Sequence, residues 1–224
     1  IRDKLVTGVQ TCALPIFLSG AKMELRDYQF EAIENLRVAI GENKKVVLSS
    51  PTGSGKTRIA SEIFSIARRR NKRVVFVVPF ISLINQTWRA FSKAGIDDRE
   101  MGVIQADHQL TDWRMPVQIA SAQTLERRPK LPEADIVIFD ECHINRKLYE
   151  RWMKDKPDVN FIGLSATPWA TGMDKLWDKM IVVSTVPKLI EQGHLAPFKY
   201  YAPAQPDLSK VRVRAGDYVE SDLE

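Results

Sequence analysis

The sequence lacks the features that mark several classes of protein. Its two cysteines, Cys12 and Cys142, are too few for a disulfide framework and lack the paired spacing of a zinc site. Its longest apolar runs, such as residues 74–78, fall far short of the ~20 residues that cross a bilayer. With 44% hydrophobic and 27% charged residues, it is neither a disordered nor a collagen-like chain. We therefore expect a soluble, globular protein of the reducing cytoplasm.

The charge balance is modestly positive. Lys and Arg number 33 against 28 Asp and Glu, a formal net charge of +5 over 224 residues. A nucleic-acid-binding surface and an ordinary solvated surface with surplus basic residues both fit this value. Arg68, Arg69 and Arg70 end a predicted helix, where they either complement the helix dipole or contact nucleic acid. The length fits one large domain or one domain plus a fragment.

Residues 1–22 do not share the patterns of the remaining chain. They show no helical or strand period, and residues 6–16 look like the in-frame translation of a common sequencing adapter. The alternatives are a secretory signal, with Arg2 and Lys4 as its basic end, and a disordered natural extension. We expect a non-native or disordered leader, with Met23 as the natural start.

Short apolar runs alternate with helical stretches over residues 23–185. The runs are rich in β-branched residues and occupy residues 46–48, 74–78, 117–120, 136–139, 161–164 and 181–183. Helical spacing covers residues 25–40, 56–70, 82–94 and 147–154. This alternation predicts an α/β fold, a doubly wound and mainly parallel sheet with helices on both faces. Residues 186–224, a short helix and a basic tail without strands, are typical of a linker or the start of another domain.

A glycine-rich loop lies between the first apolar run and a helical stretch. It consists of Ser50, Pro51, Thr52, Gly53, Ser54, Gly55, Lys56 and Thr57. The glycines let several backbone N–H groups and the helix N-terminus point at one anion. Lys56 would then reach the β- and γ-phosphates of a nucleotide, and the Thr57 hydroxyl can ligate Mg²⁺. A plain strand-to-helix turn with an exposed lysine is the alternative, and Ser50 stands where the general consensus has glycine.

Two adjacent carboxylates, Asp140 and Glu141, follow the run at residues 136–139. Such a pair resists burial unless a metal or a proton neutralises it. Asp140 can hold a phosphate-bound Mg²⁺, while Glu141 orients and deprotonates the attacking water. His143 is placed to contact the γ-phosphate or to transmit the state of the γ-phosphate to a neighbouring strand. Cys142 is expected to be a small core residue.

Small hydroxyl residues, Ser165 and Thr167, follow the next apolar run. Ligands of parallel α/β sheets bind beyond the carboxyl ends of the strands. We therefore expect these hydroxyls beside the acidic pair, where they can hydrogen-bond His143 or the carboxylates.

These elements, in this order, resemble the motifs of superfamily 2 helicases of the DExH type, the DEAD/DEAH-box proteins, and in particular a RadD-like bacterial or phage group. The resemblance implies a RecA-like P-loop NTPase domain that uses ATP and Mg²⁺, the metal lying between Thr57 and Asp140. Residues 25–29 resemble the adenine-reading motif, which assigns Arg26 and Gln29 to the nucleotide. The resemblance makes residues 23–185 the first of two RecA-like domains.

Further motifs of that family assign contacts with nucleic acid. Ser82 and Gln86 in one loop, and Gln123 and Thr124 in another, resemble segments that grip the sugar-phosphate backbone. Their alternatives are structural, with Ser82 as a helix cap and Thr124 packed within a helix. Ser165 and Thr167 correspond to the family's motif that couples the ATP site to the nucleic-acid site.

The resemblance implies an ATP-dependent nucleic-acid helicase that prefers DNA to RNA and has no membrane partner. A duplex DNA translocase that does not unwind, and a truncated, non-catalytic nucleic-acid-binding module, remain alternatives. The family's arginine finger lies in the second RecA-like domain, which is truncated in this sequence, so we expect weak ATP binding and slow hydrolysis from this chain alone. The sequence does not indicate an oligomeric state.

Overall fold

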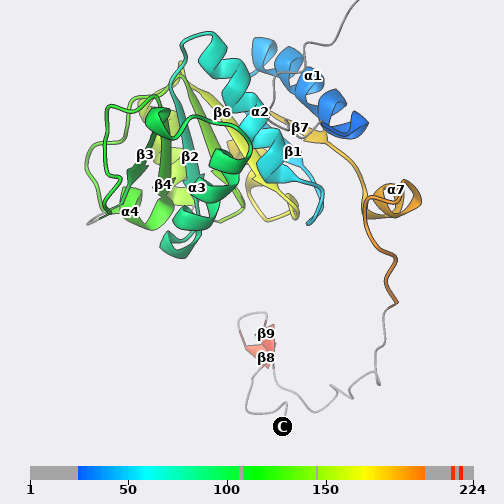
Figure 1. Ribbon diagram of the computed structural model, residues 1–224. Helices are drawn as coiled ribbons and strands as arrows, with labels where there is room; N and C mark the ends of the chain where they lie inside the picture. Colours follow the sequence, from blue (N-terminus) through cyan, green and yellow to red (C-terminus); the bar gives the residue numbers. More distant parts are fainter. Residues whose placement is uncertain (1–24, 106–107, 145, 200–212, 215–216, 219–224) are drawn as a thin grey trace, which may run out of the picture.

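The computed structural model places most of the chain after residue 24 (Figure 1). The residues that it describes are 25–105, 108–144 and 146–199, with the backbone of 213–214 and 217–218. The expected leader, with its adapter-like segment at residues 6–16, lies outside the described residues.

A seven-stranded sheet forms the centre of the fold. Its strands are β1 (Lys45–Ser49), β2 (Val74–Val78), β3 (Met101–Ile104), β4 (Val117–Ser121), β5 (Ile136–Asp140), β6 (Asn160–Ser165) and β7 (Lys179–Val182). They lie in the order β3-β4-β2-β5-β6-β1-β7, and every neighbouring pair is parallel. This confirms the predicted doubly wound α/β fold, because both faces of the sheet are covered by helices.

Helices cover the two faces of the sheet in separate groups. They are α1 (Asp27–Glu42), α2 (Lys56–Arg69), α3 (Ile84–Lys93), α4 (Ala122–Glu126), α5 (Arg146–Asp155), α6 (Met173–Leu176) and α7 (Val186–Glu191), with 3₁₀ turns η1 (Ile81–Leu83) and η2 (Asp98–Glu100). Buried side chains of α1, α2, α3 and α7 form one core cluster with the sheet, and those of α4, α5 and α6 form the other.

The side chains of β2 show how a continuous apolar run contributes to the core on both faces of the sheet. Val74, Phe76 and Val78 belong to the α1–α3 side, whereas Val75 and Val77 belong to the α4–α6 side. Successive residues of a strand point to opposite faces, so a strand buried on both sides must be apolar at every position. The sequence pattern that predicted parallel strands therefore has a direct structural cause.

The strand order also positions the site. Because β6 lies between β5 and β1, the carboxyl ends of these three strands are neighbours. Ser49 of β1 pairs with Ser165 of β6, and Asp140 of β5 pairs with Leu164 of the same strand. The residues that follow the strands must therefore meet at one edge of the sheet.

Three details differ from the sequence expectation. Strand β3 was not predicted, because four residues that include Gly102 give a weak pattern. Gly102 is needed there, since a Cβ atom would lie 2.5 Å from the backbone oxygen of Asp112. The tail after residue 199 was expected to lack strands, but β8 (Val213–Arg214) and β9 (Asp217–Tyr218) pair as an antiparallel two-stranded sheet. Helix α1 begins at Asp27 rather than at residue 25.

The boundary at residue 185 remains a prediction. Leu189 of α7 is fully buried in the core cluster that includes α1 and α2, so α7 packs on the sheet domain. None of the described helices is both long and apolar enough to span a bilayer.

Candidate active site

The phosphate loop connects β1 to α2 in a conformation that requires two glycines. Gly53 and Gly55 have φ angles of 81° and 87°, in the left-handed region that other residues adopt at a cost. At Gly55 a Cβ atom would also lie 2.5 Å from Nε2 of Gln29. The loop is attached to the sheet through the Ser50 N–H, which donates to the Ser165 carbonyl at 2.9 Å.

The N-terminus of α1 holds the phosphate loop from the other side. Nε2 of Gln29 and the hydroxyl of Tyr28 both donate to the Ser54 carbonyl, at 2.8 Å and 2.7 Å. Oε1 of Gln29 accepts from the Arg26 N–H at 3.0 Å, and Nη1 of Arg26 donates to the Tyr28 hydroxyl at 3.1 Å. Gln29, which is 4% exposed, therefore braces the loop. A contact of Gln29 and Arg26 with adenine stays a prediction.

The loop lysine and the acidic pair meet as the strand order requires. Nζ of Lys56 lies 3.2 Å from Oε1 of Glu141, and both side chains are partly buried. Glu141 has a φ angle of 46°, which turns the chain sharply at the end of β5. Burial raises the pKa of Asp140, the charge of Glu141 raises it further, and Lys56 opposes the rise. The site thus contains a carboxylate that would gain from a nearby cation.

His143 and Ser165 connect the ends of β5 and β6. The hydrogen bond expected between them is present, with Nδ1 of His143 3.0 Å from Oγ of Ser165. The same hydroxyl accepts from the Thr167 N–H at 3.0 Å, and Nδ1 of His143 lies 3.6 Å from Oε2 of Glu141. A chain of contacts therefore runs from Glu141 through His143 to the loop at Thr167.

The donor set suits a magnesium ion bound together with phosphates. Thr57 is exposed in the first turn of α2, beside Lys56, and Asp140 stands at the end of β5. A hydroxyl and a carboxylate are hard oxygen ligands, and Mg²⁺ in phosphate sites takes one or two of them together with phosphate oxygens. The raised pKa of Asp140 supports this fit, because a bound cation would stabilise the ionised form.

The four residues assigned to nucleic acid fall into two groups. Ser82, Gln86 and Gln123 are exposed, and Oε1 of Gln123 accepts from the Ile81 N–H at 3.4 Å, so the two loops touch. Ser82 is not the N-cap of α3, a position that Leu83 occupies. Thr124 is 9% exposed, and its hydroxyl accepts from the Ser121 hydroxyl at 2.8 Å. The structure therefore favours the packing interpretation of Thr124.

Sequence reasoning missed the segment that follows α7. The ring of His194 lies against the ring of Tyr28 with centroids 5.5 Å apart. A Cβ atom on Gly53 would lie 2.9 Å from Cδ2 of Leu195, so this side chain lies against the phosphate loop. No pattern in the sequence marks these contacts, because they join positions far apart in the chain.

Cys142 is fully buried among core residues of the α4–α6 side, as expected. Burial raises the pKa of its thiol, with Glu141 adding to the rise, so the thiolate is disfavoured. Such a cysteine is a packing residue rather than a nucleophile.

A phosphate loop after β1, an acidic pair after β5 and a hydroxyl motif after β6, on one parallel sheet, define the ATP-binding RecA-like domain of a superfamily 2 DExH helicase. The family comparison makes this more specific. Residues 22–170 match the family model described as "Type III restriction enzyme, res subunit", and the chain belongs to that family.

Curated relatives include phage and archaeal proteins. A 51.5 kDa protein of a Lactococcus phage is 30% identical over 185 residues, covering 80% of this chain and 37% of its own length. The DNA 3'-5' translocase XPB2 of Sulfurisphaera tokodaii is 33% identical over 159 residues, covering 70% of this chain and 34% of its own length. The chain therefore spans about a third of the length of these relatives.

Solved structures support the fold. The UvsW helicase of bacteriophage T4 aligns with a TM-score of 0.61 at 17% identity, over 71% of this chain and 60% of that chain. The type ISP restriction-modification enzyme LlaGI, solved with a DNA substrate mimic, aligns with a TM-score of 0.59 at 19% identity, over 76% of this chain and 21% of that chain.

Proposed function

We propose that this chain is the nucleotide-binding half of an ATP-driven motor that acts on DNA. The observation that carries the proposal is the contact between Lys56 and Glu141 at 3.2 Å, which joins the phosphate loop to the acidic strand end. A glycine-rich turn with a solvated lysine would not need this contact. The relative named as a DNA translocase favours DNA as the partner.

Binding of ATP would use the loop backbone first. The N–H groups of residues 52–55 and the N-terminus of α2 stabilise the phosphate charge, and Lys56 leaves Glu141 to pair with the β- and γ-phosphates. Thr57 and Asp140 would hold Mg²⁺, which when bound offsets the charge of the phosphates. Arg26 and Gln29 would contact the adenine base.

Hydrolysis would depend on Glu141, which Lys56 frees when it turns to the phosphates. Glu141 then takes a proton from the water that attacks the γ-phosphate, as a general base. His143, which contacts both Glu141 and Ser165, would report this change to the loop that holds Thr167. The nucleic-acid strand would be bound by Ser82, Gln86 and Gln123, through contacts with its sugar-phosphate backbone that do not depend on base sequence.

A second RecA-like domain would complete the cleft in the longer protein. The matched part of this chain covers only about a third of each of these relatives, which supports a larger motor. In that arrangement an arginine from the second domain stabilises the transition state. We expect this chain alone to bind ATP weakly and hydrolyse it slowly, and robust DNA-stimulated hydrolysis by the chain alone would contradict that expectation.

Duplex translocation without unwinding is a second candidate function. The family model of a restriction enzyme subunit and the relative named as a translocase favour it. Strand displacement and triplex displacement by the full-length protein separate the two functions, because a helicase releases a strand from a duplex and a pure translocase releases only a third strand. A non-catalytic module would do neither, and its binding of nucleic acid would not respond to ATP.

A further inference from the structure

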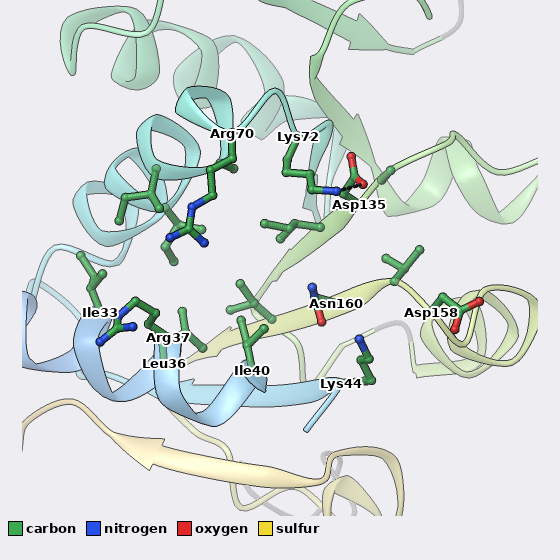
Figure 2. Close-up of a pocket in the computed structure, with 17 residues that line it drawn as sticks. Ile33, Leu36, Arg37, Ile40, Lys44, Arg70, Lys72, Asp135, Asp158 and Asn160 are labelled. Carbon is green, nitrogen blue, oxygen red and sulfur yellow. Dashed lines mark hydrogen bonds and ion pairs between the residues drawn. The ribbon is translucent and has the colours of Figure 1, made fainter. Parts of the chain in front are cut away.

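A cavity of about 510 Å³ opens between α1 and α2, which we call the α1–α2 cavity (Figure 2). Its apolar wall is formed mainly by Leu36, Ile40, Ile63, Ile66, Ile136 and Ile162. It lies over the amino ends of β5 and β6, whereas the nucleotide site lies beyond their carboxyl ends. Its volume is in the range of pockets that hold small organic molecules, roughly 300–1,000 Å³.

The wall of the cavity leaves apolar surface in contact with water. Ile40, Ile66 and Ile136 pack against the core but are only partly buried. All three line the cavity, so they form an aliphatic strip of its wall. Covering this strip with an apolar ligand is favourable, because it removes hydrocarbon surface from water.

The mouth of the cavity carries a surplus of positive charge. The charged residues that line it are the cations Arg37, Lys44, Arg70 and Lys72 and the anions Asp135 and Asp158. Lys72 is paired with Asp135 at 2.9 Å, and Arg37 is paired with Glu34, just outside the cavity, at 3.1 Å. Within the part of the chain that the structure describes, the side chains of Lys44 and Arg70 have no ion pair.

The two unpaired cations lie at different ends of the mouth. Figure 2 shows Lys44 on the same side as Asp158, whose charge is opposite. At the other end Arg70 extends from α2 across the mouth toward α1. Its neighbours in sequence are paired elsewhere, Arg68 with Glu100 at 3.2 Å and Arg69 with Glu62 at 3.7 Å. Arg70 is therefore the group that an anion would meet.

We propose that the α1–α2 cavity binds a small molecule with an apolar body and a single carboxylate. The body lies on Ile40, Ile66 and Ile136, and the carboxylate pairs with Arg70. A guanidinium is suited to this role, since it presents two parallel N–H donors to a carboxylate. The inference does not depend on the proposed motor function, because no residue of the cavity belongs to the nucleotide site.

The test is a fluorescence titration of the whole chain with 1-anilinonaphthalene-8-sulfonate, an apolar anion, followed by displacement with decanoate or with neutral decanol. We expect saturable binding at one site, and decanoate should displace the probe at lower concentration than decanol. Arg70→Glu should weaken decanoate about tenfold while leaving decanol unchanged, because an exposed ion pair is replaced by repulsion. Arg69→Glu is the matched control and should change neither.

Three results would overturn the proposal. They are probe binding that does not saturate, equal displacement by decanoate in the wild type and Arg70→Glu, and loss of the probe on addition of Mg·ATP. The last result would place the probe in the nucleotide site. Arg70 is an exposed residue at the end of a helix, so its substitution should leave the fold intact, which thermal unfolding of each variant verifies.

Discussion

Lys56 and Glu141 form an ion pair across the edge of the sheet, with Nζ 3.2 Å from Oε1. Without nucleotide, the lysine that would bind phosphate and the carboxylate that would accept a proton neutralise each other. Nucleotide binding must therefore compete with an internal partner, and the same event frees the base. Each group thus restrains the other until the substrate arrives.

Glu141→Gln should separate binding from hydrolysis. Loss of the internal partner leaves Lys56 free, so affinity for Mg·ATP should stay equal or rise a few-fold. Hydrolysis by the full-length protein should fall by about 10²–10⁴, the usual contribution of a general base. A fluorescent ATP analogue and single-turnover hydrolysis measure the two quantities. Glu133→Gln, which breaks an exposed pair with Lys156, is the control. Affinity that drops tenfold in Glu141→Gln would contradict this account.

Asp140→Asn should stabilise the protein without nucleotide at neutral pH. Because the pKa of Asp140 is raised in the folded state, the folded state binds this proton more tightly than the unfolded chain. Stability therefore falls as the pH rises from the ordinary carboxyl pKa, about 3.9, through the raised value, and the cost is fully present above it. The substitution removes that cost, a gain of roughly 0.5–2 kcal/mol at pH 7.

Urea unfolding at several pH values measures this difference, which should shrink as the pH is lowered toward 4. Asp112→Asn is the control, because a hydrogen bond from Arg114 lowers the pKa of that exposed carboxyl to about 2. It should give no stabilisation at pH 7. An Asp140→Asn variant less stable than the wild type at pH 7 would show that the ionised Asp140 carboxylate does not destabilise the folded state.

Ser165→Ala should weaken the link between the two strand ends. It removes the contact of Oγ with His143 and with the Thr167 N–H, which should lower stability by about 1 kcal/mol. ATP affinity should change less than twofold, because Ser165 does not touch the loop through its side chain. In the full-length protein, ATP hydrolysis should persist while strand or triplex displacement falls. Equal losses of both would argue against a coupling role.

Gly55→Ala should be more costly than an ordinary glycine substitution. It places a side chain at φ 87° and displaces the Gln29 amide, which is hydrogen-bonded at both ends. We expect a loss of about 2–3 kcal/mol, from conformational strain plus a broken hydrogen bond. Gly95→Ala is the matched control, since Gly95 has a φ angle of 91° and nothing within 4 Å of a Cβ atom.

A double-mutant cycle with Gln29→Ala isolates the second part of this cost. In that background Gly55→Ala should lose only the strain, about 1–2 kcal/mol. Additive losses in urea unfolding would show that Gln29 moves aside freely and does not brace the loop.

The sequence predicted β1, β2, β4, β5 and β6 because these strands are buried on both faces, whereas the edge strand β7 is largely exposed. A strand such as β2 must then be apolar throughout, and five consecutive apolar residues are visible without any structure. The phosphate loop was equally readable, since its glycines are required by the backbone itself at Gly53 and Gly55. Parallel topology then placed Asp140 and Ser165 at one edge without further information.

Contacts between distant segments could not be read in the same way. The bonds from Tyr28 and Gln29 to the Ser54 carbonyl depend on how α1 docks, and the chain around them carries no matching signal. A threonine can point its hydroxyl to solvent or to a neighbouring side chain, and the sequence does not distinguish the two. Only the packing of α4 directs the Thr124 hydroxyl to Ser121. The contact of Leu195 with Gly53 depends on where the chain folds back after α7.

The most direct test of the central claim is Mg·ATP binding by the wild type and by Lys56→Ala. The account predicts saturable, magnesium-dependent binding of a fluorescent ATP analogue that weakens about 10- to 100-fold in Lys56→Ala, because a charged hydrogen bond to phosphate is lost. Lys45 begins β1, the strand that leads into the loop, and Lys45→Ala, which breaks its ion pair with Asp178, should bind like the wild type. Equal affinity in the wild type and Lys56→Ala would contradict the assignment of this loop to nucleotide binding.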